Sequence, residues 1–146
     1  MRFIGDYSAK TDVKGRVFLP SALRKTLSAE GETKLVLRKD VFQKCLVLYP
    51  ESVWNEKLDD LKLHLNLWKR EHQDILRKFS ADAELMELDS NGRILICKSK
   101  LQYAEIDADV RFLGVDDKIE VWSKENLEKN LNANDDLGSS IEGLFA

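Results

Sequence analysis

Two short stretches of the sequence share the pattern Asp-x-x-Gly-Arg, each directly before a run of branched and aromatic residues. They read "DVKGRVFLP" and "DSNGRILIC", and their motif residues are Asp12, Gly15, Arg16, Asp89, Gly92 and Arg93. A guanidinium held at a fixed place behind a turn can make paired hydrogen bonds to a phosphate or to the edge of a base. The pattern therefore indicates two copies of a binding site for a phosphate or for the edge of a base.

The first and fourth residues of the motif suit a tight turn. An aspartate in first place can accept hydrogen bonds from the turn's own amide groups. A glycine in fourth place can take the positive φ that a three-residue hairpin loop with a bulge requires. The arginine has two interpretations: an ion pair with the aspartate that stiffens the hairpin, or a displayed contact to a phosphate or a base. Because the motif occurs twice, and once in a basic segment, we favour the displayed contact.

The charge of the chain is unevenly distributed. The net charge is -3, but from Met1 to Lys25 basic residues outnumber the acidic Asp6 and Asp12, and the end from Asp116 onward is acidic. Such asymmetry indicates one basic surface on an otherwise acidic body. The basic residues that we expect to contact DNA are Arg16, Lys14, Lys10, Arg2, Arg24 and Arg93.

Similar elements follow the motif in both halves of the chain. In the first half, "RVFLP" predicts a strand, a helix starts next to Pro20, and "TKLVLRKD" and "KCLVLYP" predict two strands. In the second half, "ELMEL" and "RILIC" predict strands around the turn, "KSKLQYA" predicts a short helix, and "DVRFLGVDDKIEVW" predicts two strands. Gly15 and Gly92 are 77 residues apart and Tyr49 and Trp122 are 73 apart, so the sequence predicts an internal duplication with a small deletion.

The segment between the halves has apolar residues at alternating steps of three and four from Trp54 to Phe79. This spacing predicts a long helical segment, broken into two helices near Asn66. The apolar seam is longer than the two small halves of the chain are expected to cover by themselves, which favours a homo-oligomer. Another helix is predicted after Trp122, with Ser123 as its N-cap.

The predicted organisation has two similar halves, a connector and a tail. The tail is polar and poorly patterned, so we expect it to be flexible. The expected bounds are 1–55 for the first half, 56–80 for the connecting helical segment, 81–132 for the second half and 133–146 for the tail.

Several classes of protein are not indicated by the sequence. It has no Gly-rich phosphate loop, nucleophile elbow or carboxylate pair at a defined spacing, so we do not expect an enzyme or a cofactor. His64 and His72 lie on the helical segment without partner ligands, and Cys45 and Cys97 lie in apolar strands, so no metal site is predicted. We expect both cysteines to be small buried residues. No membrane span or secretion signal is apparent, and we expect a cytoplasmic chain with reduced thiols.

Four stretches together resemble the MraZ family of bacterial transcriptional regulators over nearly the whole chain up to the tail. They are Gly5–Lys25, Cys45–Trp54, Phe79–Ala104 and Val110–Glu125. The resemblance implies an α+β fold with two tandem AbrB-like β half-barrels of the swapped-hairpin type, which form a pseudo-two-fold barrel with peripheral helices. It also implies assembly into a ring on double-stranded DNA, at short direct promoter repeats upstream of the division and cell-wall gene cluster. A nucleoid-associated location follows from that role.

Two departures and two alternatives accompany this resemblance. Cys97 stands where a proline is usual, as Pro20 is in the first half, and Gln102 stands where an arginine would be common. The second half is therefore expected to contact DNA less strongly, or to serve assembly. One alternative is an AbrB-like antitoxin, normally a single half-barrel with a disordered tail. The other is a purely structural ring-forming interaction protein, which would need no basic surface.

Overall fold

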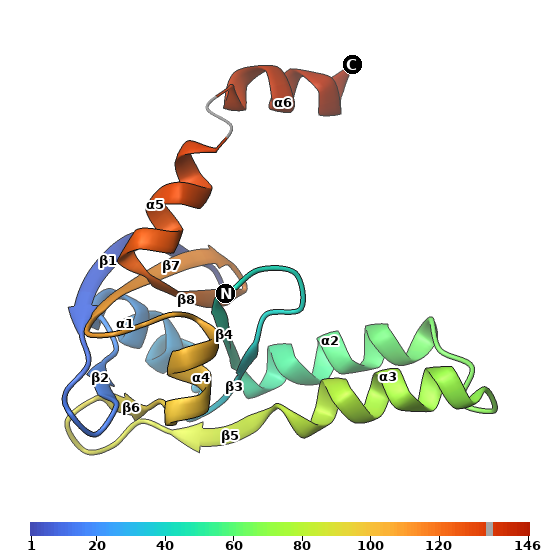
Figure 1. Cartoon of the computed structure of the whole chain (residues 1–146), viewed down its shortest axis with the longest axis horizontal. Coiled ribbons are helices and arrows are strands. Elements are labelled where there is room, and N and C mark those ends of the chain that lie inside the picture. Colours follow the sequence, from blue (N-terminus) through green and yellow to red (C-terminus); the bar gives the residue numbers. More distant parts are fainter. Residues whose placement is uncertain (134–135) are drawn as a thin grey trace.

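The computed structural model describes residues 1–133 and 136–146, which form a mixed α+β structure (Figure 1). The first half contains β1 (Phe3–Lys10), β2 (Arg16–Phe18), α1 (Ser21–Ala29), β3 (Lys34–Lys39) and β4 (Leu46–Pro50). The connector contains α2 (Glu51–Leu63) and α3 (Arg70–Ala81). The second half contains β5 (Glu84–Glu87), β6 (Arg93–Leu95), α4 (Lys98–Tyr103), β7 (Asp109–Asp116), β8 (Lys118–Ser123) and α5 (Lys124–Asn132), and α6 (Leu137–Phe145) follows.

The two halves exchange strands. Six strands form one antiparallel sheet in the order β1-β7-β8-β4-β3-β5, and β2 and β6 form a separate two-stranded ribbon. Strand β1 pairs with β7 of the other half along its whole length, and β5 pairs in the same way with β3. The equivalent strands β4 and β8 pair at the centre of the sheet. Each half therefore has its sheet extended by a strand from the other half.

The repeated order of elements is as the sequence predicts, but the sheet is not closed. Strands β1 and β5 lie at its two edges, so the predicted pseudo-two-fold barrel is not formed by the described residues. The half-barrel geometry of the swapped-hairpin type stays a prediction. Strand β1 was not among the predicted elements, whereas the helix start at Pro20 and the Ser123 cap of α5 are confirmed.

The core joins the ribbon to the sheet. Val17 and Ile94, at the centre of the ribbon, are each 1% exposed, and they belong to the same cluster as large side chains of the sheet and of α1. Full burial of such a side chain contributes about 1.5–3 kcal/mol. Cys45 is also fully buried, but Cys97 is only partly buried, so the expectation of a core position is wrong for Cys97. Its Sγ atom lies 3.3 Å from the hydroxyl of Ser99, at the start of α4.

Helices α2 and α3 form a hairpin that projects from the sheet (Figure 1). The predicted break near Asn66 is confirmed. At the base of the hairpin, the rings of Trp54 and Phe79 stack with centroids 5.1 Å apart, and the guanidinium of Arg38 lies 4.1 Å from the centre of the Phe79 ring. At the other end Trp68 is 96% exposed. Among the described residues, the hairpin is therefore packed at its base and exposed at its far end.

Part of the tail is helical. Residues 137–145 form α6, which the sequence pattern did not predict, and the flexibility of this segment stays a prediction. The part of that prediction that falls on 134–135 lies outside the described residues. Over the residues that the structure describes, no helix is both long enough and apolar enough to cross a membrane.

Candidate nucleic-acid interface

The first motif forms the turn between β1 and β2. One carboxylate oxygen of Asp12 accepts hydrogen bonds from the amides of Lys14 and Arg16, both at 2.9 Å. The amide of Asp12 donates to the carbonyl of Arg16 at 2.9 Å, and the amide of Gly15 donates to the carbonyl of Asp12 at 3.1 Å. The predicted role of the aspartate as acceptor for the turn is confirmed.

The second motif repeats this arrangement between β5 and β6. The carboxylate of Asp89 accepts from the amides of Asn91 and Arg93, again at 2.9 Å each. The amide of Gly92 donates to the carbonyl of Asp89 at 3.0 Å. The two turns thus have the same hydrogen-bond pattern although only three residues of the motif are shared.

These bonds lower the pKa of both carboxyl groups. For Asp12 the largest cause is the hydrogen bond from the backbone amide of Arg16, and the arginine side chain acts in the same direction, while partial desolvation opposes them. Arg93 lowers the pKa of Asp89 in the same way. Both carboxylates are therefore ionised at neutral pH, with the negative charge that an ion pair needs.

Each turn rests against the other half of the chain. Gly15 has φ +85° and Gly92 has φ +82°, as predicted from the turn type. The amide of Ile96 donates to the carbonyl of Gly15 at 2.9 Å, and the amide of Leu19 donates to that of Gly92 at 3.0 Å. An added Cβ would lie 2.4 Å from the Ile96 carbonyl oxygen in the first turn and 2.6 Å from Nη1 of Arg24 in the second. Glycine is therefore favoured in both places by its conformation, and at Gly15 the backbone of Ile96 also leaves no space for a side chain.

Both motif arginines are ion-paired with their aspartates. Nε of Arg16 donates to Oδ2 of Asp12 at 2.7 Å, and Nε of Arg93 donates to Oδ2 of Asp89 at 2.8 Å. In neither arginine do Nη1 and Nη2 have a hydrogen-bond acceptor among the described residues. Those two nitrogens are the ones that can bind a guanine edge or a phosphate in pairs. The two interpretations of the arginine are thus compatible, because the aspartate orients the guanidinium and leaves its outer edge free.

The ribbon places the two arginines on one face. Its register pairs Arg16 with Leu95, Val17 with Ile94 and Phe18 with Arg93. Because side chains alternate along a strand, the central pair points into the core and the outer pairs point outward. Phe18 is 55% exposed and Leu95 57%. We call this outward surface the ribbon face; it consists of Arg16, Phe18, Arg93 and Leu95.

The other predicted DNA contacts lie at different distances from the ribbon face. Lys14 is exposed in the first turn, and Lys10, at the end of β1, is exposed with Nζ 3.9 Å from the Asp109 carboxylate. Arg24 is partly buried, and its Nε donates to the carbonyl of Leu19 at 2.9 Å, so it braces the second turn. Arg2 precedes β1 and lies roughly 26 Å from Lys10, at about 3.3 Å per residue. The structure therefore brings together all of these residues except Arg2.

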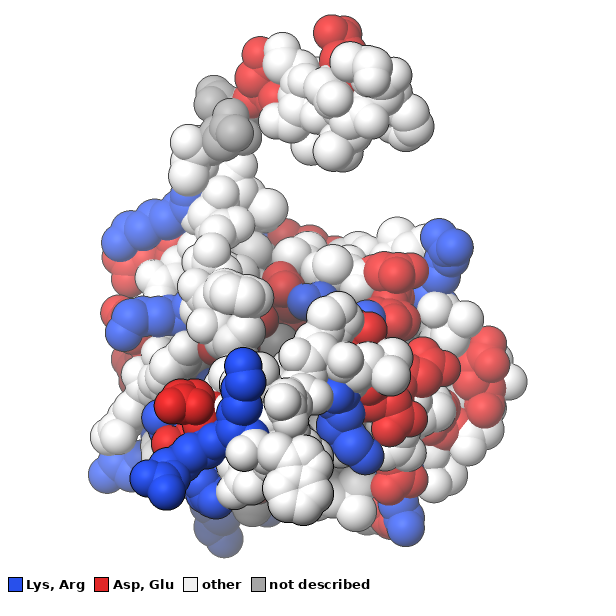
Figure 2. Space-filling model, turned by 90° about the vertical axis from the view of Figure 1, so that its right-hand side faces the viewer, with Lys and Arg blue, Asp and Glu red and all other residues white. Residues whose placement is uncertain are grey.

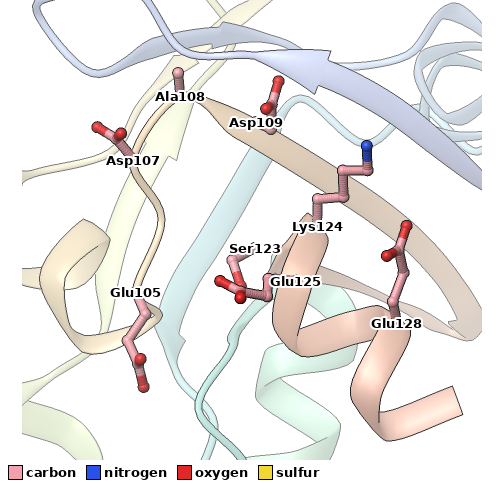
Figure 3. A pocket seen from close by; sticks show the side chains of 8 residues that line it. All are labelled: Glu105, Asp107, Ala108, Asp109, Ser123, Lys124, Glu125 and Glu128. Atoms are coloured by element: carbon pink, nitrogen blue, oxygen red, sulfur yellow. The ribbon is translucent and has the colours of Figure 1, made fainter. Parts of the chain in front are cut away.

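Acidic residues limit the basic surface on one side. A cavity of about 360 Å³ adjoins the chain just before the first turn, where the amide of Thr11 donates to the carbonyl of Ala108 at 2.9 Å. It is lined by Glu105, Asp107, Ala108, Asp109, Ser123, Lys124, Glu125 and Glu128 (Figure 3). Figure 2 views the molecule from the side of the helical hairpin and shows basic and acidic groups mixed on that face. Neither surface is uniformly basic. Strands β2 and β6 lie at the opposite end of Figure 1 from the helical hairpin.

A group of potential metal ligands was not predicted from the sequence. Ligand atoms of Asp40, Cys45 and Glu120 lie within 4.8 Å of one another. Asp40 accepts hydrogen bonds from two loop amides and Glu120 from the indole of Trp122, and burial raises the pKa of the Cys45 thiol. Both carboxylates of this group therefore already accept hydrogen bonds from the protein itself.

Comparison with known proteins assigns the chain to a family. The family model for the MraZ protein, described as antitoxin-like, matches residues 2–78 and again residues 79–140. The chain belongs to the MraZ family. The double match agrees with the internal duplication that the sequence predicts, and its boundary falls within α3.

Curated members of the MraZ family are similar to the chain over almost its full length. The transcriptional regulator MraZ of Bacteroides fragilis is 53% identical, and the match covers 99% of this chain and 92% of that relative. The transcriptional regulator MraZ of Phocaeicola vulgatus is also 53% identical, and the match covers 99% of this chain and 94% of that relative. The transcriptional regulator MraZ of Christiangramia forsetii is 35% identical, with 99% of this chain and 94% of the relative covered. The family assignment therefore extends through both motifs.

Proposed function

We propose that this MraZ-family transcriptional regulator binds double-stranded DNA sequence-specifically through the ribbon face and the two turns beside it. The observation that carries the proposal is the matched pair of arginines, each held through Nε by an aspartate with Nη1 and Nη2 left free. A guanidinium in this state is oriented before DNA arrives, so less rotational freedom is lost on binding. The acidic cavity beside the first turn favours approach from the ribbon side.

The two motifs are not equivalent in this proposal. The side chain of Arg16 is 37% exposed, but that of Arg93 is 22% exposed and lies with its guanidinium carbon 5.7 Å from the centre of the Phe18 ring. We therefore propose that Arg16 contributes more to DNA affinity than Arg93. Lys14 and Lys10 add charge next to Arg16, while Arg24 acts through the second turn.

We further propose that the regulator works as a homo-oligomeric ring on short direct repeats, in promoters upstream of the division and cell-wall gene cluster, within the nucleoid. One protomer offers few cations, and each phosphate contact adds only a modest, salt-sensitive increment to affinity, so a single protomer should bind weakly. Linked sites can raise avidity by about 10² to 10⁴. Leu63 and Trp68, 83% and 96% exposed on the projecting hairpin, support contact between protomers.

Light scattering should return several times the protomer mass; a monomer at micromolar concentration would contradict the ring.

A gel shift with DNA from upstream of the protein's own gene tests the function. The wild-type protein should shift this fragment at lower concentration than a shuffled fragment, and the shift should weaken as salt rises. Arg16→Ala should weaken it strongly. Arg77→Ala is the matched control, because it removes an exposed arginine that is also paired with an aspartate, Asp74, but on α3. Equal loss in both variants would show that net charge alone matters and would contradict a specific site.

Two other functions remain as alternatives with distinct outcomes. The antitoxin-like description of the family favours an AbrB-like antitoxin, which would also bind DNA but would copurify with a toxin protein. A structural ring-forming protein would assemble and show no salt-dependent DNA binding. No enzymatic step is part of any of these proposals.

A further inference from the structure

The ribbon face contains two apolar side chains that the motif arginines do not explain. Phe18 and Leu95 are more than half exposed, whereas Val17 and Ile94 beside them are buried. The cross-strand register puts each apolar side chain opposite an arginine: Phe18 faces Arg93 and Leu95 faces Arg16. The four outward side chains therefore alternate, cationic and apolar, around the centre of the ribbon.

The dimensions of the ribbon face match those of the DNA major groove. Neighbouring outward residues on one strand are about 6.6 Å apart, and cross-strand partners are about 5 Å apart. The major groove is about 12 Å wide and admits a two-stranded ribbon. Successive base pairs are about 3.4 Å apart along the DNA axis. The arginine and the apolar residue of one strand, about 6.6 Å apart, would therefore meet base pairs about two steps apart.

The chemistry of the groove then selects the partner of each side chain. Guanine offers two acceptors to an arginine, but an apolar side chain can gain nothing from an acceptor or from a phosphate. The methyl group of thymine is the apolar group on the major-groove edges of the bases. We propose that Phe18 and Leu95 are specificity-determining residues that contact thymine methyl groups in the major groove. This inference rests on the proposed DNA-binding function.

The surroundings of the two residues favour DNA over a second protein copy as the partner. Two guanidinium groups border the apolar pair on the same face, and the aspartates that neutralise them lie within the turns. The ribbon face itself contains no acidic side chain, so a second copy of it would offer no carboxylate to the free Nη1 and Nη2 atoms, whereas DNA offers phosphates and base acceptors. The guanidinium carbon of Arg93 also lies 5.7 Å from the centre of the Phe18 ring, within the range of a cation–π contact.

The recognised DNA sequence would not be symmetric. Phe18 and Leu95 occupy equivalent sides of the ribbon, but an aromatic ring and a branched chain differ in shape and reach. The two ends of the bound sequence would therefore be read differently. A site of this kind has a direction, which suits repeats in the same orientation better than inverted ones.

Removal of thymine methyl groups tests the proposal directly. Full-length protein is titrated with the upstream fragment and with the same fragment made with deoxyuridine in place of thymidine. The wild-type protein should bind the uracil DNA about three- to tenfold more weakly, as expected for one or two lost methyl contacts. Phe18→Ala should bind thymine DNA more weakly and lose most of the difference between the two DNAs, and Leu95→Ala should do so to a smaller extent.

Ile4→Ala is the matched control, because Ile4 is an exposed apolar residue of β1 at the far end from the turns. It should keep the full difference between the two DNAs. Equal affinity of the wild-type protein for both DNAs would overturn the inference and leave the proposed function standing. A fall in oligomer mass for Phe18→Ala would assign the face to a protomer contact and overturn it as well. Absence of binding to either DNA would overturn the proposed function itself, and this inference with it.

Discussion

The guanidinium of Arg24 lies against the turn at Gly92, with Nη1 2.6 Å from the place of an added Cβ. The equivalent position in the second half, 77 residues later, is Leu101, whose Cδ1 atom is 3.5 Å from the corresponding place at Gly15. An arginine thus supports one turn and a leucine the other. The cost of a side chain at Gly15 or Gly92 therefore depends on the residue that lies against that glycine, and not on the motif alone.

Alanine at the two motif glycines should therefore differ in cost. Both substitutions impose a positive φ on a residue with a side chain, which costs about 1–3 kcal/mol. Gly15→Ala also meets the backbone carbonyl of Ile96, which cannot move without disturbing the ribbon, whereas Gly92→Ala meets the end of a flexible side chain. Urea unfolding should show the larger loss of stability for Gly15→Ala. Equal losses would mean that the backbone at Ile96 can move to make room for the added Cβ.

Arg16→Ala and Asp12→Ala should separate DNA contact from support of the turn. Arg16→Ala should leave unfolding and oligomer mass nearly unchanged and lower DNA affinity by tenfold or more, because the loss recurs in every protomer. Its affinity should depend less steeply on salt if the contact is to phosphate, or its sequence preference should change if the contact is to a base. Asp12→Ala should destabilise the turn, because two amides lose their acceptor. Unchanged affinity in an assembled Arg16→Ala protein would reduce the motif to a stiffened hairpin.

The stability that the two turns contribute to the fold should depend on pH. The pKa values of Asp12 and Asp89 are lowered in the folded chain, so the unfolded chain binds protons more readily than the folded one does. The stability from these groups is therefore complete above the ordinary aspartate pKa of 3.8 and is lost as the pH falls through the lower folded values. The double variant Asp12→Asn, Asp89→Asn should unfold with a flatter pH dependence in this acidic range. The same slope in both proteins would show that other carboxylates dominate.

The two cysteines should react differently. Cys45 is fully buried and burial raises the pKa of its thiol, whereas Cys97 is partly exposed. An alkylating reagent should modify Cys97 and spare Cys45 in the folded protein, as mass spectrometry of peptides can show. Cys45→Ser should destabilise by about 1–3 kcal/mol, because its hydroxyl would be buried in an apolar cluster. Loss of DNA binding on mild oxidation of the wild-type protein would indicate a redox response that this arrangement does not explain.

The sequence predicts the local features of the motif and not the contacts between halves. The acceptor role of Asp12 and the positive φ of Gly15 follow from residue type, because they depend on neighbours in the chain. Strand β1 is different: its inward side includes only Phe3, Gly5, Tyr7 and Ala9, and its pairing partner β7 lies about a hundred residues away. The alternation of β1 is hard to recognise in the sequence because the inward Gly5 and Ala9 are small and the apolar Ile4 points outward.

The ribbon face could have been predicted in part. The apolar runs after the motifs suggest complete burial, but strict alternation from buried Val17 and Ile94 places Phe18 and Leu95 outside. The ion pairs of Arg16 and Arg93 were one of two expected arrangements, while the free edge of each guanidinium could be recognised only from the positions of atoms. The partial exposure of Cys97 was not predicted, because the sequence shows it only as the end of an apolar run, directly before the helix that begins at Lys98 as expected.

The exchange of β1 and β5 between the halves bears on how such a chain could have arisen. If the halves were separate molecules, the same pairings would make an intertwined homodimer with two identical sides, and every substitution would appear twice. Joining them in one polypeptide fixes the stoichiometry and lets each side change alone, as Arg24 opposite Leu101 and Phe18 opposite Leu95 illustrate. Gene fusion would thus have converted a symmetric homodimer into a single chain whose two sides differ.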